Sequence, residues 1–341
     1  MTQKTDYTKK LTAWLHDPAE KQLVLMRDPV GHEGGSIVEV GKALGLPTRP
    51  AMRKKNGQWI ELNYDKLKQD KSVHIADCLA AAADRPTWPR GEDAKPYPKF
   101  ESVHFTKDPE LIHPLSGERL KLGPLSLDIG VDSVKAVSQD HFQSLIQEDD
   151  ETLRKTFLAF WRFGPEAGQH ADQLGVLWNM LPADSRTPDH SIWSHIDTVS
   201  AIHTALAGDD TGPDEPALLV MSFGPVQGFI GQARSTSDLW AGSHLLSSLV
   251  FEAMKPIISH LGPDCMVFPA LRGVPVVDQW LMSPEVGGDA FVKLFEAIDS
   301  ELLATTERKP CVTHWHAWRG SSAARWWIGP AMHWRSACAA V

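Results

Sequence analysis

The sequence predicts an α+β multidomain protein, with a mostly helical part up to about residue 206 and an α/β part after it. A length of 341 residues exceeds one ordinary domain. Apolar residues recur at helical spacing through most of the first 205 residues. After the polar segment AGDDTGPDE, residues 207–215, the pattern changes to short strand-like runs. Hydrophobic residues make up 42% and charged residues 23%, which are ordinary globular proportions.

A short amphipathic helix is expected near the N-terminus, within TKKLTAWLHD, residues 8–17. Its apolar residues lie at i, i+3 and i+4, and Pro18 forbids smooth continuation. His16 and Asp17 should therefore lie at a helix end.

The other elements of this part follow from the same reasoning. Residues 72–84 are rich in Ala and Leu, which predicts a helix with Ser72 as its N-cap. The polar residues 47–70 are expected to be irregular, and residues 86–127 to form a long surface excursion with some strand. Further helices are expected within residues 141–164 and 188–206.

The C-terminal part reads as an α/β unit. ALLVMSF, residues 217–223, and MVFPAL, residues 266–271, have the length and composition of strands. Between them we expect a helix within GPVQGFIGQAR, residues 224–234, and a second one starting near Ser237 or Asp238. The predicted division is 1–206, a linker at 207–216, a second domain at 217–312 and an atypical tail at 313–341.

Charge and composition limit the function. The formal net charge of -9 argues against a free-standing nucleic-acid binder, because phosphate contacts need clustered Lys and Arg, and predicts weak, salt-sensitive binding at most. No apolar stretch is long enough to cross a membrane and the N-terminus lacks a signal peptide, so we expect a cytoplasmic protein. The four cysteines lie far apart, which predicts reduced thiols and no zinc knuckle.

The adjacent pair His16 and Asp17 is the residue combination of HD-type metal phosphohydrolases, in which imidazole and carboxylate hold an ion that activates water. One such dipeptide is weak evidence, and an ordinary helix end is the alternative interpretation. Further ligand-type residues lie in helical contexts, namely His32, Glu33, His74, Asp77, Asp189, His190 and His195. Asp189 and His190 could alternatively cap the helix that begins near Ser191.

Several segments together resemble the large subunit of type III-B, or Cmr, CRISPR effector complexes, and they occur in the family's order. These segments are LHDPAEK (15–21), GHE (31–33), IADCLAAAADR (75–85), HPLSG (113–117), LPADSRTPDHSIWSH (181–195) and SFGPVQGFIGQARSTSDLWAGSHLLS (222–247). The resemblance covers roughly residues 10–282. It implies that this chain is a truncated N-terminal portion with an HD-type nuclease domain (1–206) and an incomplete ferredoxin-like palm (217–312).

For the HD domain, the resemblance implies a catalytic pair at His16 and Asp17 and metal-dependent cleavage of single-stranded DNA with Mn, Mg or Ni. It places five further residues in the same motif: Asp77, Asp84, Asp189, His190 and His195. Which of these five bind the ion and which support the ligands stays open at this point.

For the palm, the resemblance implies nucleotide binding, with cyclic oligoadenylates made from ATP by the complete domain. Gly224, Pro225 and Gln227 follow a predicted strand and open a helix, where backbone amides could contact a phosphate; a tight strand-to-helix turn is the alternative. The family's Gly-Gly-Asp-Asp hairpin is not found in this sequence. The string GGDA, residues 287–290, lacks the second Asp and precedes a predicted helix, so we expect no cyclase or polymerase activity from this chain alone.

The resemblance also implies partners: the other Cmr subunits, a guide RNA and a target RNA, in antiviral defence. Two other functions fit the residues, a stand-alone HD phosphohydrolase that acts on nucleotides and a non-catalytic assembly subunit. The tail from Thr313 departs from the family and resembles translation in a shifted frame, although its Trp and Arg residues could also form a patch for stacking bases.

Overall fold

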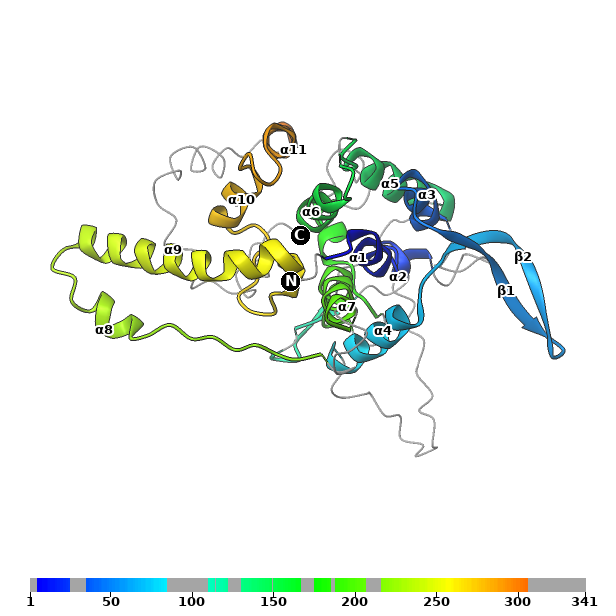
Figure 1. The fold of residues 1–341 in the computed structure, drawn as a ribbon, viewed down its shortest axis with the longest axis horizontal. Coiled ribbons are helices and arrows are strands. Elements are labelled where there is room, and N and C mark those ends of the chain that lie inside the picture. Colours follow the sequence, from blue (N-terminus) through cyan, green and yellow to red (C-terminus); the bar gives the residue numbers. More distant parts are fainter. Residues whose placement is uncertain are drawn as a thin grey trace, which may run out of the picture. The chain divides into compact units, whose positions relative to one another are not determined.

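The computed structural model separates the chain into two compact units, Met1–Pro216 and Ala217–Val341 (Figure 1). It describes residues 5–24, 35–84, 110–113, 115–121, 130–148, 150–166, 175–184, 188–206 and 216–305. The predicted sites at His32 and Glu33, most of the linker and the whole tail from Thr313 lie outside these residues. The structure mixes helices with two small sheets, as expected of an α+β protein.

The first unit is mostly helical. Its helices are α1 (Tyr7–Trp14), α2 (Lys21–Val24), α3 (Ser36–Ala43), α4 (Lys71–Asp84), α5 (Val131–Ser144), α6 (Arg154–Phe163) and α7 (Ile192–Leu206), with a 3-10 turn at Gly175–Met180. Two antiparallel strand pairs join them: β1 (Thr48–Lys55) with β2 (Gln58–Leu67), and β3 (Glu110–Ile112) with β4 (Arg119–Lys121). His16 and Asp17 follow directly after α1, as the helical pattern predicted.

An aromatic core holds the helices of this unit together. Trp14 of α1 packs against Phe142 of α5 and Phe160 of α6, with ring centroids 5.8 and 6.0 Å apart. Helix α6 is buried from Thr156 to Phe163, so it runs through the core instead of covering it. The indole of Trp14 donates to Asp197 of α7 at 2.9 Å, which fixes α1 against α7.

Helices α4 and α7 approach each other closely because small residues line their contact. Ala76 and Ala80 of α4 pack on Val199 of α7, and all three are fully buried. The side chain of Asp70 accepts from the Val73 amide at 3.0 Å, so Asp70 caps α4 and the prediction of Ser72 was wrong by two residues. Likewise, the Ser191 hydroxyl caps α7 by accepting from the Ser194 amide, and not Asp189 or His190.

Residues 47–70, expected to be irregular, instead form the β1–β2 hairpin. Asn56 and Gly57 make its two-residue turn, with φ of 50° and 84°. Asn-Gly between two extended runs is the typical sequence of such a turn, and this signal was overlooked. The base of the hairpin packs on α3, where a side chain at Gly41 would lie 2.3 Å from Leu67 of β2. Gly41 thus permits the contact.

The second unit is helical in the part that the structure describes. Its helices are α8 (Val226–Ile230), α9 (Thr236–Leu261), α10 (Pro275–Leu281) and α11 (Asp289–Thr305), with a 3-10 turn at Pro263–Cys265. Helix α9 starts one to two residues earlier than predicted, because the Ser235 hydroxyl accepts from the Asp238 amide. The buried residues of this unit include Met254 of α9, Leu281 of α10 and Phe291 of α11.

The strands predicted at 217–223 and 266–271 are absent from the described part of this unit, so that expectation was wrong for these residues. Leu218, Val220 and Phe268 are each 87% exposed, and no described segment hydrogen bonds alongside them as a neighbouring strand. An apolar run of strand length becomes a strand only where a neighbouring strand takes up its amides and carbonyls. A ferredoxin-like palm sheet stays a prediction.

Three further expectations can be compared with the structure. Asp289 of the GGDA string begins α11, so this string starts a helix as predicted and joins no pair of strands. Cys78 and Cys265, the two described cysteines, are free thiols. Among the described helices, none combines the length and apolar character that a membrane span requires.

Candidate metal site

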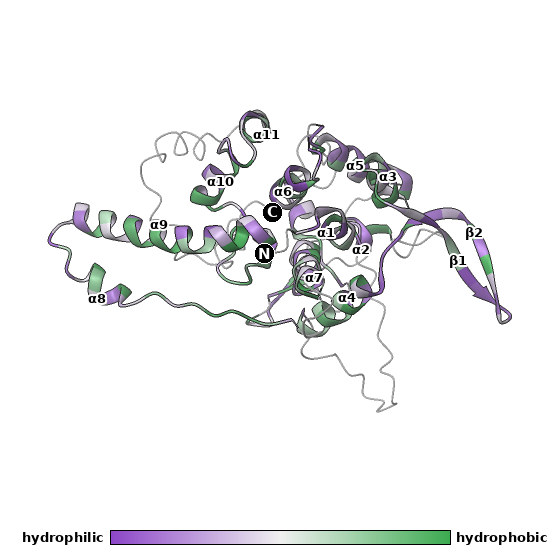
Figure 2. Ribbon diagram, viewed as in Figure 1, coloured by the Kyte–Doolittle hydropathy of each residue, from purple (hydrophilic) through white to green (hydrophobic). Residues whose placement is uncertain are grey.

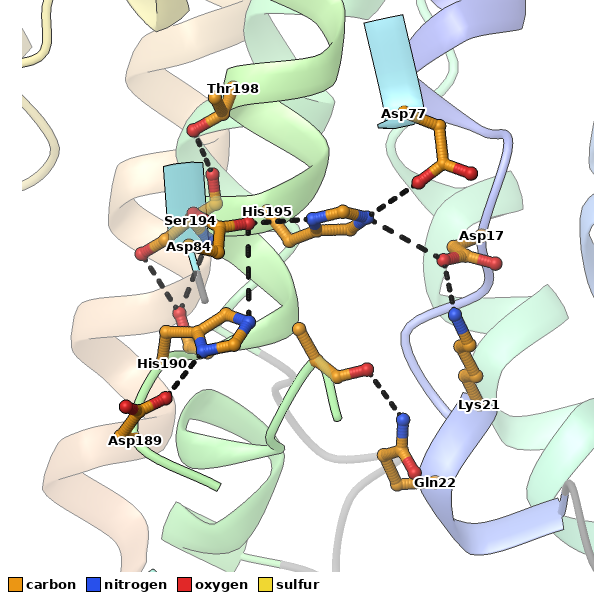
Figure 3. Close-up of polar contacts among 12 residues, drawn as sticks. Asp17, Lys21, Gln22, Asp77, Asp84, Asp189, His190, Ser194, His195 and Thr198 are labelled. Atoms are coloured by element: carbon orange, nitrogen blue, oxygen red, sulfur yellow. Dashed lines mark hydrogen bonds and ion pairs between the residues drawn. The ribbon is translucent and has the colours of Figure 1, made fainter. Parts of the chain in front are cut away.

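Three residues from separate parts of the first unit bring ligand atoms together. His16, after α1, Asp77 of α4 and His195 of α7 each offer one atom, and these atoms all lie within 4.8 Å of one another. The Nε2 of His195 lies 3.4 Å from the Asp77 carboxylate and 3.9 Å from that of Asp17 (Figure 3). Two ligands of one ion, each at about 2.1 Å from it, stand about 3–4 Å apart. The spacing therefore fits a shared cation.

The hydrogen bonding of His16 leaves one of its two ring nitrogens available. The Nδ1 of His16 lies 2.9 Å from the Ala13 carbonyl, which can only accept, so this nitrogen carries the proton. The Nε2 of His16 is buried without a hydrogen-bond partner among the described residues. It lies 3.5 Å from Asp17 and 3.8 Å from Asp77. A buried nitrogen lone pair that faces two carboxylates is a fit for a metal ion.

The ionisation of these groups follows from burial and neighbouring charge. Burial lowers the pKa of His16, although Asp17 opposes the effect. Burial also disfavours charge on His195, but hydrogen bonds to Asp77 and Asp84 and the charge of Asp17 raise its pKa to about 9. The hydrogen bond to His195 lowers the pKa of Asp77. The centre thus holds one neutral imidazole, one protonated imidazole and carboxylates.

Asp84 lies behind His195 and not beside the other ligand atoms. Its carboxylate accepts from the Nδ1 of His195 at 2.8 Å, on the ring side away from Asp77 (Figure 3). Asp77 and Asp84 are seven residues apart on α4, about 10 Å along the axis and on one face, so one helix contacts both sides of the ring. His190 lies 4.0 Å from Asp84 and 2.7 Å from Asp189. The predicted residues thus divide into two sets. Around the candidate metal position lies a front group of His16, Asp17, Asp77 and His195, and behind His195 lies a row of Asp84, His190 and Asp189.

Lys21 also belongs to this site, although it was not among the predicted site residues. Its Nζ lies 2.6 Å from the carboxylate of Asp17, four residues earlier. A cavity of about 150 Å³ opens beside the pair and is lined by His16, Asp17, Lys21, Gln69, Val73, His74 and Asp77. The spacing of Asp and Lys four residues apart in LHDPAEK is the signal that could have identified it.

The residues predicted to contact a nucleotide lie elsewhere, in the second unit. Gly224 and Pro225 precede α8, a helix of five residues, and all three predicted residues, Gly224, Pro225 and Gln227, are exposed. Pro225 has no amide hydrogen to offer. Nucleotide binding at this turn stays a prediction.

Comparison with known proteins identifies the chain. Residues 218–321 match the family described as CRISPR-associated protein Cmr2, N-terminal. The Cmr2 subunit of the Cmr CRISPR system of Pyrococcus furiosus is 26% identical over 323 residues, which cover 83% of this chain and 33% of that protein. The Cmr2 subunit of Saccharolobus solfataricus is 32% identical over 91 residues, 27% of this chain and 9% of that protein.

These matches place the chain in the class of large subunits of type III-B CRISPR effector complexes. Within that class the chain matches Cmr2 proteins over most of its length, as the sequence resemblance indicated. The chain spans about a third of the length of the first of these relatives.

Proposed function

We propose that the first unit is a metal-dependent HD-type nuclease domain that cleaves single-stranded DNA, within the large subunit of a Cmr effector complex. The observation that carries the proposal is the buried Nε2 of His16, which has no hydrogen-bond partner among the described residues and faces Asp17 and Asp77. His195 presents its own Nε2 to the same two carboxylates. Such a set suits an ion with affinity for both nitrogen and oxygen, so Mn or Ni fits it better than Mg.

The ion would be held by His16, Asp77 and His195, with Asp17 as a fourth ligand. When bound, it supplies a nucleophile by lowering the pKa of a bound water and offsets charge on the phosphate. Binding of the ion would require His195 to give up its Nε2 proton, and Asp84 would then hold the remaining proton on Nδ1 so that Nε2 faces the ion. Lys21 lies at the cavity wall, where its ammonium group can neutralise a phosphate oxygen of the bound strand.

The partners and the second activity belong to the same proposal. Other Cmr subunits, a guide RNA and a target RNA would surround the chain during antiviral defence. The second unit would be the first part of a palm that binds ATP, with Gly224, Pro225 and Gln227 near a phosphate. The exposed apolar run at 217–223, with Leu218 and Val220 each 87% exposed, supports a contact with another subunit or with further palm strands, because exposed apolar surface marks interaction sites.

Two other functions make different predictions. A stand-alone HD phosphohydrolase would hydrolyse nucleotides faster than DNA, so a panel of both substrates distinguishes it. A non-catalytic assembly subunit with a vestigial site would be purified without bound metal and would take up none, which elemental analysis measures.

The main test compares DNA cleavage by the unchanged chain and by the His16→Ala, Asp17→Ala double variant, with Mn, Ni or Mg added after chelation. We expect a loss of at least about a hundredfold, because removal of two ligands leaves the ion under-coordinated. The exposed His244→Ala in α9 is the matched control and should cleave normally. Undiminished cleavage by the double variant would contradict the assignment.

A further inference from the structure

The β1–β2 hairpin has a part that packs on the rest of the protein and a part that does not. Its base contributes the buried residues Ala51 and Leu67. From Met52 to Ile60, which we call the hairpin tip, every residue is exposed. Figure 2 shows the tip projecting from the helices of the first unit with mostly hydrophilic colouring. A two-stranded ribbon that buries so little contributes little to the stability of its own unit.

The charge of the hairpin is opposite to that of the whole chain. Residues 48–60 hold four cations, Arg49, Arg53, Lys54 and Lys55, and no Asp or Glu, whereas the formal net charge of the chain is -9. None of these four side chains forms an ion pair with the residues that the structure describes. By contrast, Lys42 near the hairpin base lies within 4 Å of both Glu39 and Asp65. The tip therefore offers cations without internal partners.

An aromatic side chain lies among these cations. Trp59 is 65% exposed and is the cross-strand partner of Lys54, while Arg53 pairs with Ile60. Directly opposed residues share one face of the ribbon, with their Cβ atoms about 5 Å apart. One face thus presents a large flat ring beside an ammonium group, and the other presents a guanidinium group beside an apolar side chain.

We propose that the hairpin tip binds single-stranded nucleic acid, with bases stacked on Trp59 and phosphates contacted by Lys54 on the same face and by Arg53 and Lys55 on the opposite face of the narrow ribbon. Exposed aromatic rings interleaved with cations are how proteins hold single strands without reading their sequence. A duplex does not offer its base faces to a ring on a ribbon, so the single strand is the better match. The positive charge of the tip complements the phosphates of a nucleic acid and does not complement a protein surface with few acidic residues.

The position of the hairpin gives this binding a use. Strand β2 leads through Lys68 to Gln69, which lines the cavity beside His16 and Asp77. The ten residues of β2 span about 30 Å, so a single-stranded nucleic acid bound at the tip lies within a few nucleotides of that cavity. This last link rests on the proposed nuclease function, whereas binding at the tip does not.

The test measures the affinity of the full chain for a fluorescently labelled single-stranded DNA of about 16 nucleotides. Anisotropy titrations are made in chelator and on the His16→Ala, Asp17→Ala background, so that failure of the nuclease proposal cannot alter the result. The first variant, the tip variant, combines Arg53→Ala, Lys54→Ala and Lys55→Ala. The control variant removes three exposed lysines elsewhere, Lys9, Lys121 and Lys293, for the same change in charge.

We expect the tip variant to weaken binding at least tenfold and to reduce the slope of log affinity against log salt by about two, because about 0.7 of a counterion is released per phosphate. Trp59→Ala should weaken binding by roughly fivefold or more with little change in this slope, and Trp59→Phe should restore most of the loss. The control variant should bind within twofold of the parent. Thermal unfolding of each variant should match the parent, since these side chains are exposed.

Equal losses in the tip variant and the control variant would overturn the proposal, because they would show dependence on net charge alone. Unchanged DNA affinity in both the tip variant and Trp59→Ala would also overturn it. If the same variants then failed to bind Cmr subunits, the tip would be a protein-docking surface.

Discussion

At the scale of single residues, the carboxylates near the candidate metal site differ in what they contact. Asp77 faces the ligand atoms of both histidines, whereas Asp84 contacts the far nitrogen of His195. In metal sites a carboxylate that accepts a hydrogen bond from the non-ligating nitrogen of a histidine fixes the orientation of the imidazole ring and raises the basicity of its ligand nitrogen. Asp77 and Asp84 should therefore affect metal binding to different degrees.

We expect Asp84→Ala to weaken Mn affinity by about 10- to 100-fold, and Asp84→Asn to retain part of it, because the Asn carbonyl can still accept from Nδ1. Asp77→Ala should lose more. Isothermal titration calorimetry with Mn measures all three. Asp189→Ala is the control, since its carboxylate pairs with His190, 2.7 Å away, and its loss should change affinity little. A loss in Asp189→Ala as large as that in Asp84→Ala would contradict the division into a front group and a row behind it.

Glu20 is a buried carboxyl outside the metal site. It is fully buried and accepts from the hydroxyls of Ser36 in α3 and Ser138 in α5. Burial raises its pKa above the ordinary value of 4.5, although the two hydroxyls and Lys135 oppose the effect. The folded protein thus binds this proton more tightly than the unfolded chain does. The stability from Glu20 is complete below pH 4.5 and is lost as the pH rises toward the folded pKa.

We therefore expect Glu20→Gln to be as stable as the parent in mild acid and more stable at neutral pH, because the amide keeps both contacts without a charge. Glu20→Ala should lose about 1–3 kcal/mol at either pH, since both hydroxyls lose their acceptor. Thermal unfolding of the three proteins over this pH range is the measurement. A neutral-pH unfolding temperature of Glu20→Gln below that of the parent would refute the linkage.

At the scale of elements, helix α6 determines how the site is supported. Phe160 packs on Trp14 and on Phe142 at 5.1 Å, and Trp14 lies two residues before His16. Helical periodicity predicted α6 but not its burial on every side. That burial depends on α1 and α5, which the sequence does not place around it.

Phe160→Ala should lower the free energy of unfolding of the first unit by about 3–5 kcal/mol, because the removed ring leaves a cavity in the aromatic core. Urea unfolding followed by circular dichroism tests this. The exposed Ser133→Ala in α5 should change it by less than about 0.5 kcal/mol. A loss under about 1 kcal/mol in Phe160→Ala would mean that the core closes around the gap.

The hairpin shows where element prediction failed and why. Residues 47–70 carry many charges and little apolar alternation, so their pattern indicated irregular structure. Strand pairing here is set by the Asn56–Gly57 turn and by two apolar side chains at the base, and not by a buried face. Conversely, the strongly apolar runs at 217–223 and 266–271 have no neighbouring strand among the described residues, and such a strand would be needed to make them β-structure.

At the scale of the whole molecule, the chain should not make oligoadenylates by itself. Two-metal phosphoryl transfer requires carboxylates placed close together, and the only candidate string in the sequence, GGDA, starts helix α11 at Asp289. We expect no oligoadenylate by mass spectrometry after incubation with ATP and Mg or Mn. Product that survives Asp289→Ala would reveal an unrecognised active site. Product that disappears with this change would show that GGDA was wrongly dismissed.

The sequence by itself determined the family, the helical character of the first unit and the position of His16 and Asp17 after a helix. These features depend on local periodicity, on Pro18 and on long matching segments, all of which are properties of the chain order. Only the tertiary structure decided which of the predicted ligands meet. Ala76 and Ala80 let α4 approach α7, and this approach places Asp77 and Asp84 on opposite sides of the His195 ring. Residues more than a hundred positions apart meet through such packing, which no local pattern encodes.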